Sequence, residues 1–220
     1  MDFSFSGDQL DNISLILVLG GLALIPFLAV MGTSFVKIVV VFSLLRNALG
    51  VQQIPPNMAL YGVALILTLY IMAPVGYDIR DFVDANPHLL ESSEHYKELF
   101  DGSVAPYVSF LKAHTSDTEK TFFIDSAKRL WPQRHADNVS EDSLLVLMPA
   151  FTVSQVTEAF KIGFLIYLPF LVIDLIVSNI LLAMGMMMVS PMTISLPFKL
   201  LLFVVLDGWT TLTHNLVMSY

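Results

Sequence analysis

The 220-residue chain has no cysteine and few charged residues, and both shortages narrow its function. Without cysteine it has neither disulfides, nor a thiol nucleophile, nor thiolate zinc ligands. Its five histidines form no HExxH motif, and neither a GxSxG elbow nor a Walker A loop is present. We therefore predict no enzyme activity, no cofactor and no metal. The formal net charge of −8 also argues against nucleic acid as a partner.

Hydrophobic residues are abundant instead, at 55% of the chain against 14% charged. A soluble domain carries about a quarter charged residues, so this composition indicates a membrane-type protein. Apolar segments of roughly 20 residues can cross a bilayer as helices. Four segments qualify or come close: Ile13–Met31, Met58–Gly76, Phe160–Leu182 and Leu196–Leu206, the last extending to Leu216 if the helix continues. The predicted fold is all-α, built from membrane-type helical hairpins.

The first apolar segment, Ile13–Met31, has the hydrophobicity of a signal peptide but not its flanks. Asp2, Asp8 and Asp11 precede it, and no Lys or Arg does. A signal requires a basic n-region, so we predict a retained helix, kinked at Pro26.

Charge divides the chain into three regions: hydrophobic residues 1–76, an acidic region 77–143 and hydrophobic residues 144–220. The middle region holds thirteen of the nineteen acids and seven of the eleven bases, and its composition predicts a small soluble helical domain. The connection 32–57 contains two bases and no acid. The positive-inside rule places that connection in the cytoplasm and the acidic domain outside, in the periplasm of a Gram-negative cell.

Charges within apolar segments are costly, so each of them requires a partner. Lys37 and Arg46 are nine residues apart, hence on opposite sides of a helix over 32–50. Either this helix breaks or both charges meet protein groups. Asp174 lies in mid-segment, Lys199 follows Pro197 by two residues, and Asp207 comes eight residues later. We expect these five residues to form buried or interfacial charge pairs, with Lys199 in the first turn of a helix that starts at Pro197.

Two other functions use the same aspartates. An intramembrane aspartyl protease would need YD and GxGD motifs, but Asp174 lies in VIDL and Asp207 in LDGW, so we reject it. An ion-coupled membrane transporter subunit, with Asp174 as the proton or cation site, remains the alternative.

Five of the nine residues from Met184 to Met192 are methionine, interrupted by Gly185 and closed by Pro191. These two residues favour a loop over a continuous helix. Flexible thioether side chains can exclude water yet deform around a passing chain. They can equally fill an irregular interface, and the residues alone leave both interpretations open.

Three stretches resemble one known family. They are FVKIVVVFSLLRNALGVQQIPPN (residues 35–57), AFKIGFLIYLPFLVIDL (159–175) and LLAMGMMMVSPMTISLPFKLLLFVVLDGW (181–209). They resemble the FliP/SctR family of core export-gate subunits in type III secretion systems. Within this family, the sequence most resembles the branch found in Ysc-type injectisomes.

The resemblance implies a non-enzymatic pore subunit in the bacterial inner membrane. Several copies, five by family likeness, would join SctS-like and SctT-like subunits and then SctU-like and SctV-like components in a helical oligomeric pore. Secreted polypeptides would pass through its centre. Much of the assembled core would lie on the periplasmic side, buried in protein rather than lipid, with membrane lipid as a further partner of the complex.

The resemblance also implies a role for the methionine run. It favours a gate in which Met186, Met187 and Met188 seal the closed channel. Met184, Gly185, Pro191 and Met192 would then support that loop.

Overall fold

The computed structural model describes residues 19–23, 26–27, 30–51, 54–90, 95–136 and 139–220. About half of the expected helix Ile13–Met31, residues 13–18, 24–25 and 28–29, lies outside these residues, so the predicted kink at Pro26 is not described. The elements are α2 (Phe35–Leu49), α3 (Asn57–Ala85), η1 (Pro87–Leu90), α4 (Tyr96–Ala113), α5 (Asp117–Leu130), α6 (Gln133–Ala136), α7 (Leu144–Ala183), α8 (Pro191–Val205) and α9 (Gly208–Met218). The described part of the chain contains helices and no strand, which confirms the all-α prediction.

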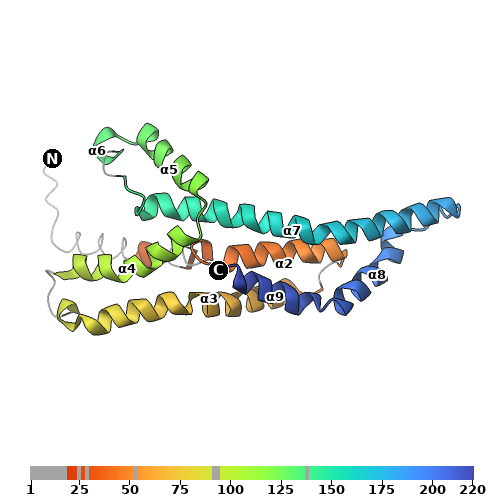
Figure 1. Cartoon of the computed structure of the whole chain (residues 1–220), viewed down its shortest axis with the longest axis horizontal. Coiled ribbons are helices and arrows are strands. Elements are labelled where there is room, and N and C mark those ends of the chain that lie inside the picture. Colours follow the sequence, from red (N-terminus) through yellow and green to blue (C-terminus); the bar gives the residue numbers. More distant parts are fainter. Residues whose placement is uncertain (1–18, 24–25, 28–29, 52–53, 91–94, 137–138) are drawn as a thin grey trace, which may run out of the picture.

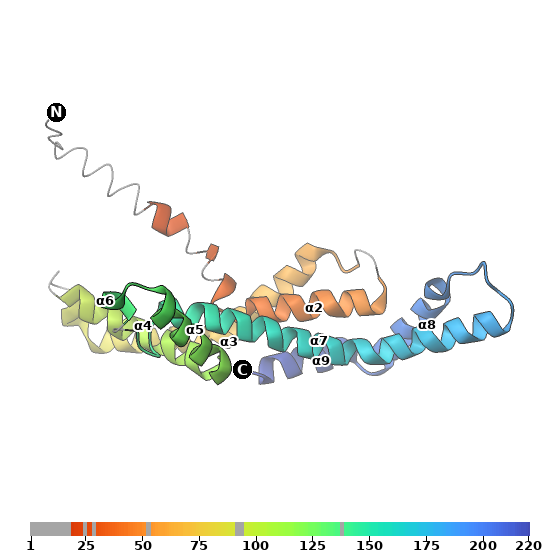
Figure 2. The same cartoon turned by 90° about the horizontal axis from the view of Figure 1, so that it is seen from above.

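The molecule is elongated, and α7 runs along most of its length (Figure 1). A helix of 40 residues spans about 60 Å at 1.5 Å per residue. Helices α4, α5 and α6 lie at one end of this axis, whereas the turn between α7 and α8 lies at the other (Figures 1 and 2). The acidic region and the methionine loop are thus at opposite ends of the molecule.

The main core forms where α2 packs along α7. Ile38, Val41, Phe42 and Leu45 are fully buried, and their spacing places them on one face of α2. On the facing helix, a Cβ added at Gly163 would lie 2.2 Å from Cδ1 of Leu44, so this position admits no side chain. The close approach of α2 and α7 explains why seven of the 15 residues of α2 are buried.

Two described helices, α3 and α7, are long and apolar enough to cross a membrane. Helices α8 and α9, bent by 59° at their junction, could form a third span. The bend makes the segment from residue 196 onward two helices, rather than one continuous helix.

Two predicted helix ends are wrong. Helix α3 passes through Pro74 and ends at Ala85, beyond the expected end at Gly76. Helix α8 begins at Pro191, with Pro197 inside it. Helix α7 starts at Leu144, directly after the polar residues 140–143, and continues through the expected segment Phe160–Leu182 and two prolines. In apolar surroundings, ending the helix would leave several backbone N–H and C=O groups without hydrogen-bond partners, whereas a proline removes only one hydrogen bond.

Candidate functional site: the methionine loop and the charges behind it

The methionine loop, residues 184–190, connects the far ends of α7 and α8. Gly185 has φ 75°, a left-handed conformation that suits glycine, and the amide of Met186 donates to the carbonyl of Leu181 at 2.9 Å. Pro191 is the first residue of α8, where its missing N–H is not needed. The predicted loop is therefore present, and Gly185 and Pro191 define its two ends.

The side chains of this loop project from the chain. Met187 is 82% exposed, Met188 is fully exposed and Met186 is partly covered. Met184 and Met192 are also largely exposed, so within one chain they do not form a packed layer behind the loop. Apolar groups with so few contacts in their own chain require lipid, another subunit or further copies of themselves around them.

Behind the loop, an ion pair between a buried lysine and a partly buried aspartate joins α7 to α8. The Nζ of Lys199 lies 2.6 Å from Oδ2 of Asp174 and also donates to the carbonyl of Ala48, at 3.2 Å. The hydroxyl of Ser195 donates to Oδ1 of Asp174 at 2.6 Å. Each charge has the partner that its apolar helix requires. The partner of Lys199 is Asp174 rather than Asp207, and Lys199 lies two turns inside α8, away from the unfavourable end of the helix dipole.

Lys37 is fully buried on α2 and meets groups from α7 and the chain's last residue. Its Nζ lies 3.0 Å from Oε2 of Glu158, without hydrogen-bond alignment, and 4.5 Å from the ring centroid of Tyr220. Burial lowers the pKa of Lys37, while the carboxylate of Glu158 opposes this shift. The phenol of Tyr220 donates to the side-chain oxygen of Gln155, whose amide donates to the carbonyl of His114 at 2.8 Å.

Arg46, on the opposite side of α2, bonds to the side-chain oxygen of Asn57. Helix α2 is continuous, so of the two outcomes expected for Lys37 and Arg46 the structure has the second: both charges meet protein groups. Asp207 lies in the turn between α8 and α9 with φ 47° and is exposed. Among the described contacts, neither Arg46 nor Asp207 has a partner of opposite charge.

The sequence analysis missed Ser195, Glu158, Gln155 and Tyr220. Glu158 and Gln155 do carry a signal, because a polar residue within an apolar helix requires a partner. Ser195 and Tyr220 carry none, because serine and tyrosine are common at helix surfaces and chain ends.

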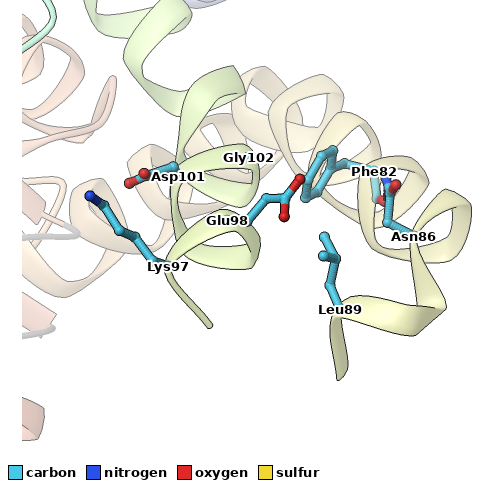
Figure 3. A pocket seen from close by; sticks show the side chains of 7 residues that line it. All are labelled: Phe82, Asn86, Leu89, Lys97, Glu98, Asp101 and Gly102. Atoms are coloured by element: carbon cyan, nitrogen blue, oxygen red, sulfur yellow. Dashed lines mark hydrogen bonds between the residues drawn. The ribbon is translucent and has the colours of Figure 1, made fainter. Parts of the chain in front are cut away.

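A hollow of about 460 Å³ lies at the other end of the molecule, between α3, η1 and α4 (Figure 3). Glu98 points toward Phe82, whereas Lys97 and Asp101 lie on another side of α4. A Cβ added at Gly102 would lie 2.0 Å from the ring of Phe82, so glycine lets α3 and α4 approach closely. No group of His, Asp and Glu among the described residues is arranged to hold a metal ion. We therefore interpret the hollow as a result of how α3, η1 and α4 pack.

Helices long enough to span a membrane, with charge pairs inside apolar segments, define an all-helical protein of the membrane type. The sequence model of the FliP family matches residues 18–216, so the chain belongs to the FliP family. This confirms the resemblance of the three stretches.

Curated relatives match over nearly their whole length. The chain is 66% identical to "Yop proteins translocation protein R" of Yersinia pestis, over 96% of this chain and 97% of that one. It is 52% identical to "Virulence protein YscR" of Salmonella typhimurium, over 94% and 96%. It is 49% identical to "Hypersensitivity response secretion protein HrcR" of Ralstonia nicotianae, also over 94% and 96%.

Proposed function

We propose that this chain is a pore-forming subunit of a type III secretion export apparatus in the bacterial inner membrane. Copies of the chain surround a conduit for unfolded secreted proteins, together with SctS-like and SctT-like subunits. SctU-like and SctV-like components join this core. The chain has no catalytic role, and energy comes from partners.

The observation that carries the proposal is the projecting methionine loop in a chain 66% identical to a translocation protein. The loop lies at the end of apolar helices, and its connection to them is fixed by Gly185 and Pro191. Loops of this kind, arranged around one axis, form a hydrophobic constriction that excludes water and ions when closed. The ion pair Asp174–Lys199 joins α7 and α8 behind it.

The alternative, an ion-coupled transporter subunit, would use Asp174 as a cation site. That carboxylate already accepts from the ammonium of Lys199 and the hydroxyl of Ser195. A carboxylate neutralised in this way attracts a further cation weakly. The geometry thus favours a structural ion pair.

Native mass spectrometry of the detergent-purified chain tests the assembly. Expressed with SctS-like and SctT-like neighbours, it should give one complex that contains several copies of the chain, five by family likeness. Deletion of the chain should abolish export of secreted substrates in the same cells. A monomer under every condition, with or without these neighbours, would favour the transporter.

The three regions 1–76, 77–143 and 144–220 remain part of the proposal, with the acidic region periplasmic. A cysteine at Ser116 should be labelled by a membrane-impermeant maleimide in intact spheroplasts. Ser116 suits this probe because it is exposed and its side chain makes no capping hydrogen bond for α5. The cysteine-free parent chain supplies the unlabelled control. Labelling only after the inner membrane is permeabilised would reverse the topology.

A further inference from the structure

We propose that Asp207 of one copy enters the hollow around Arg46 of a second copy, so that this ion pair joins neighbouring copies. The inference rests on the proposed oligomer and specifies a contact within it. Of the five charges predicted to be buried or interfacial, Lys37, Asp174 and Lys199 meet an opposite charge within the chain. The two that remain have opposite signs.

The hollow around Arg46 is a suitable site for a carboxylate, because no acidic residue of the hollow neutralises its positive charge. It has a volume of about 710 Å³, and its polar lining comes from Arg46, Asn47 and Asn57, without any acid. The guanidinium has five N–H donors, and among the described residues only the amide oxygen of Asn57 accepts from it. The N-terminus of α3 begins beside it, and its helix dipole adds to the positive potential. A single carboxylate would neutralise this hollow.

Asp207 presents such a carboxylate from a rigid turn. Its left-handed backbone is uncommon for any residue except glycine, and aspartate and asparagine tolerate it best. The turn is fixed by its neighbours: the ring of Trp209 packs against Phe42 and Phe203, with centroids 5.8 and 5.6 Å apart. The backbone that carries the carboxylate is therefore held in place before any partner binds, which reduces the entropy cost of an interface.

The surroundings of both charges match an interface better than lipid or water. Val204, Val205 and Leu206, which precede Asp207, are each more than 60% exposed. Met192, which lines the hollow around Arg46, is 60% exposed, and Met58, which follows Asn57 in the chain, is 86% exposed. Lipid suits the apolar side chains but not a charge, whereas water suits the charge alone. A partner with an opposite charge inside an apolar rim satisfies both.

The placement of the two surfaces fits copies standing side by side. The start of α3 and the junction of α8 and α9 lie at similar positions along the long axis (Figures 1 and 2). Figure 2 shows them on opposite sides of α2. Parallel copies therefore bring the Asp207 surface of one to the Arg46 surface of the next. A contact between two different surfaces, repeated around an axis, closes a ring or continues as a helix.

An anionic phospholipid is the other occupant of suitable charge for the hollow. Its phosphate would pair with Arg46, but it would leave the carboxylate of Asp207 unpaired among apolar side chains. A second copy satisfies both charges in one contact, so the observations favour it.

Disulfide trapping tests the contact directly, because the native chain has no cysteine to interfere. The variant carrying Arg46→Cys and Asp207→Cys, oxidised in membranes with its partner subunits, should give a ladder of covalent dimers and larger multimers. The single variants should give none. A matched pair, Arg46→Cys with Asp84→Cys, uses an exposed acid near the distant end of α3 and should stay monomeric.

A double-mutant cycle checks the charge itself. Arg46→Gln and Asp207→Asn should each lower the native-gel yield of multimer by about tenfold, the effect of about 1.4 kcal/mol. The double variant should lose no more than either single variant, since the lost interaction is the same. Asparagine tolerates the left-handed backbone, so Asp207→Asn removes charge without adding strain.

The outcomes separate this contact from the oligomer. Multimers on native gels with no disulfide ladder and additive losses would overturn the Arg46–Asp207 contact, while the assembly would stand. A second result would also overturn the contact and assign the hollow to lipid. In that case anionic phospholipid copurifies with the parent chain and with Asp207→Asn but not with Arg46→Gln, and Asp207→Asn assembles normally. A monomer in the parent chain would instead refute the proposed function.

Discussion

Replacing Asp174 by alanine should nearly abolish assembly of the complex, and replacing Lys199 by alanine should also lower it. Asp174→Ala leaves the ammonium of Lys199 charged and buried between α7, α8 and the end of α2, and an uncompensated buried charge costs about 3–5 kcal/mol. Lys199→Ala leaves the carboxylate of Asp174 without its cation, and its cost is smaller because that side chain is 33% exposed. Native gels should show the loss of multimer, and secretion of substrates should fall with it.

A double variant separates this effect from a cation site. Asp174→Asn with Lys199→Met removes both charges, so it should recover much of the multimer that Lys199→Ala loses. Lys161→Ala, an exposed lysine on the same α7, serves as the matched control and should assemble normally. If Asp174 instead binds a transported cation, no change at Lys199 will rescue its variants. Normal assembly and secretion in both single variants would refute the structural role.

The sequence was sufficient to predict the fold class and the need for charge partners, but not the identity of the partners. Positions nine residues apart placed Lys37 and Arg46 on opposite sides of α2, and the structure has them there. The pairing of Lys199 with Asp174 depends on how α8 folds back along α7. Asp207 is closer to Lys199 in sequence, eight residues away, but separation in sequence does not decide which charges meet.

Helix ends were harder to predict, for a related reason. Proline is common at the start of a helix, so Pro197 was predicted to begin one, yet α8 continues through it and α3 likewise continues through Pro74. Proline is unfavourable inside a helix in water, where the chain can leave the helix and water can bind the freed backbone groups. In a long apolar segment, water is absent, so a continuous helix is needed to satisfy the other backbone N–H and C=O groups. Gly185 was a better signal, because its left-handed conformation depends on local geometry alone.

Replacing Met186, Met187 and Met188 together by alanine should leave assembly intact but make the closed complex leak small ions. These side chains make few contacts within the chain, so their removal costs the fold little. A hydrophobic constriction excludes ions only while it is narrow and dry, and three shortened side chains per copy widen it. Cells that overproduce the variant complex should grow slowly and take up small molecules faster than cells with the parent complex.

Leucine at the same three positions provides the sharper comparison. Leucine restores apolar volume without the flexibility of a thioether, so it should seal better than alanine and yet adapt less well to a passing polypeptide. The triple leucine variant should therefore reduce leakage relative to alanine while slowing secretion. Met218→Ala, an exposed methionine at the end of α9, controls for loss of thioether alone and should not leak. A triple alanine variant that assembles without any rise in permeability would show that the loop packs against neighbours and does not gate.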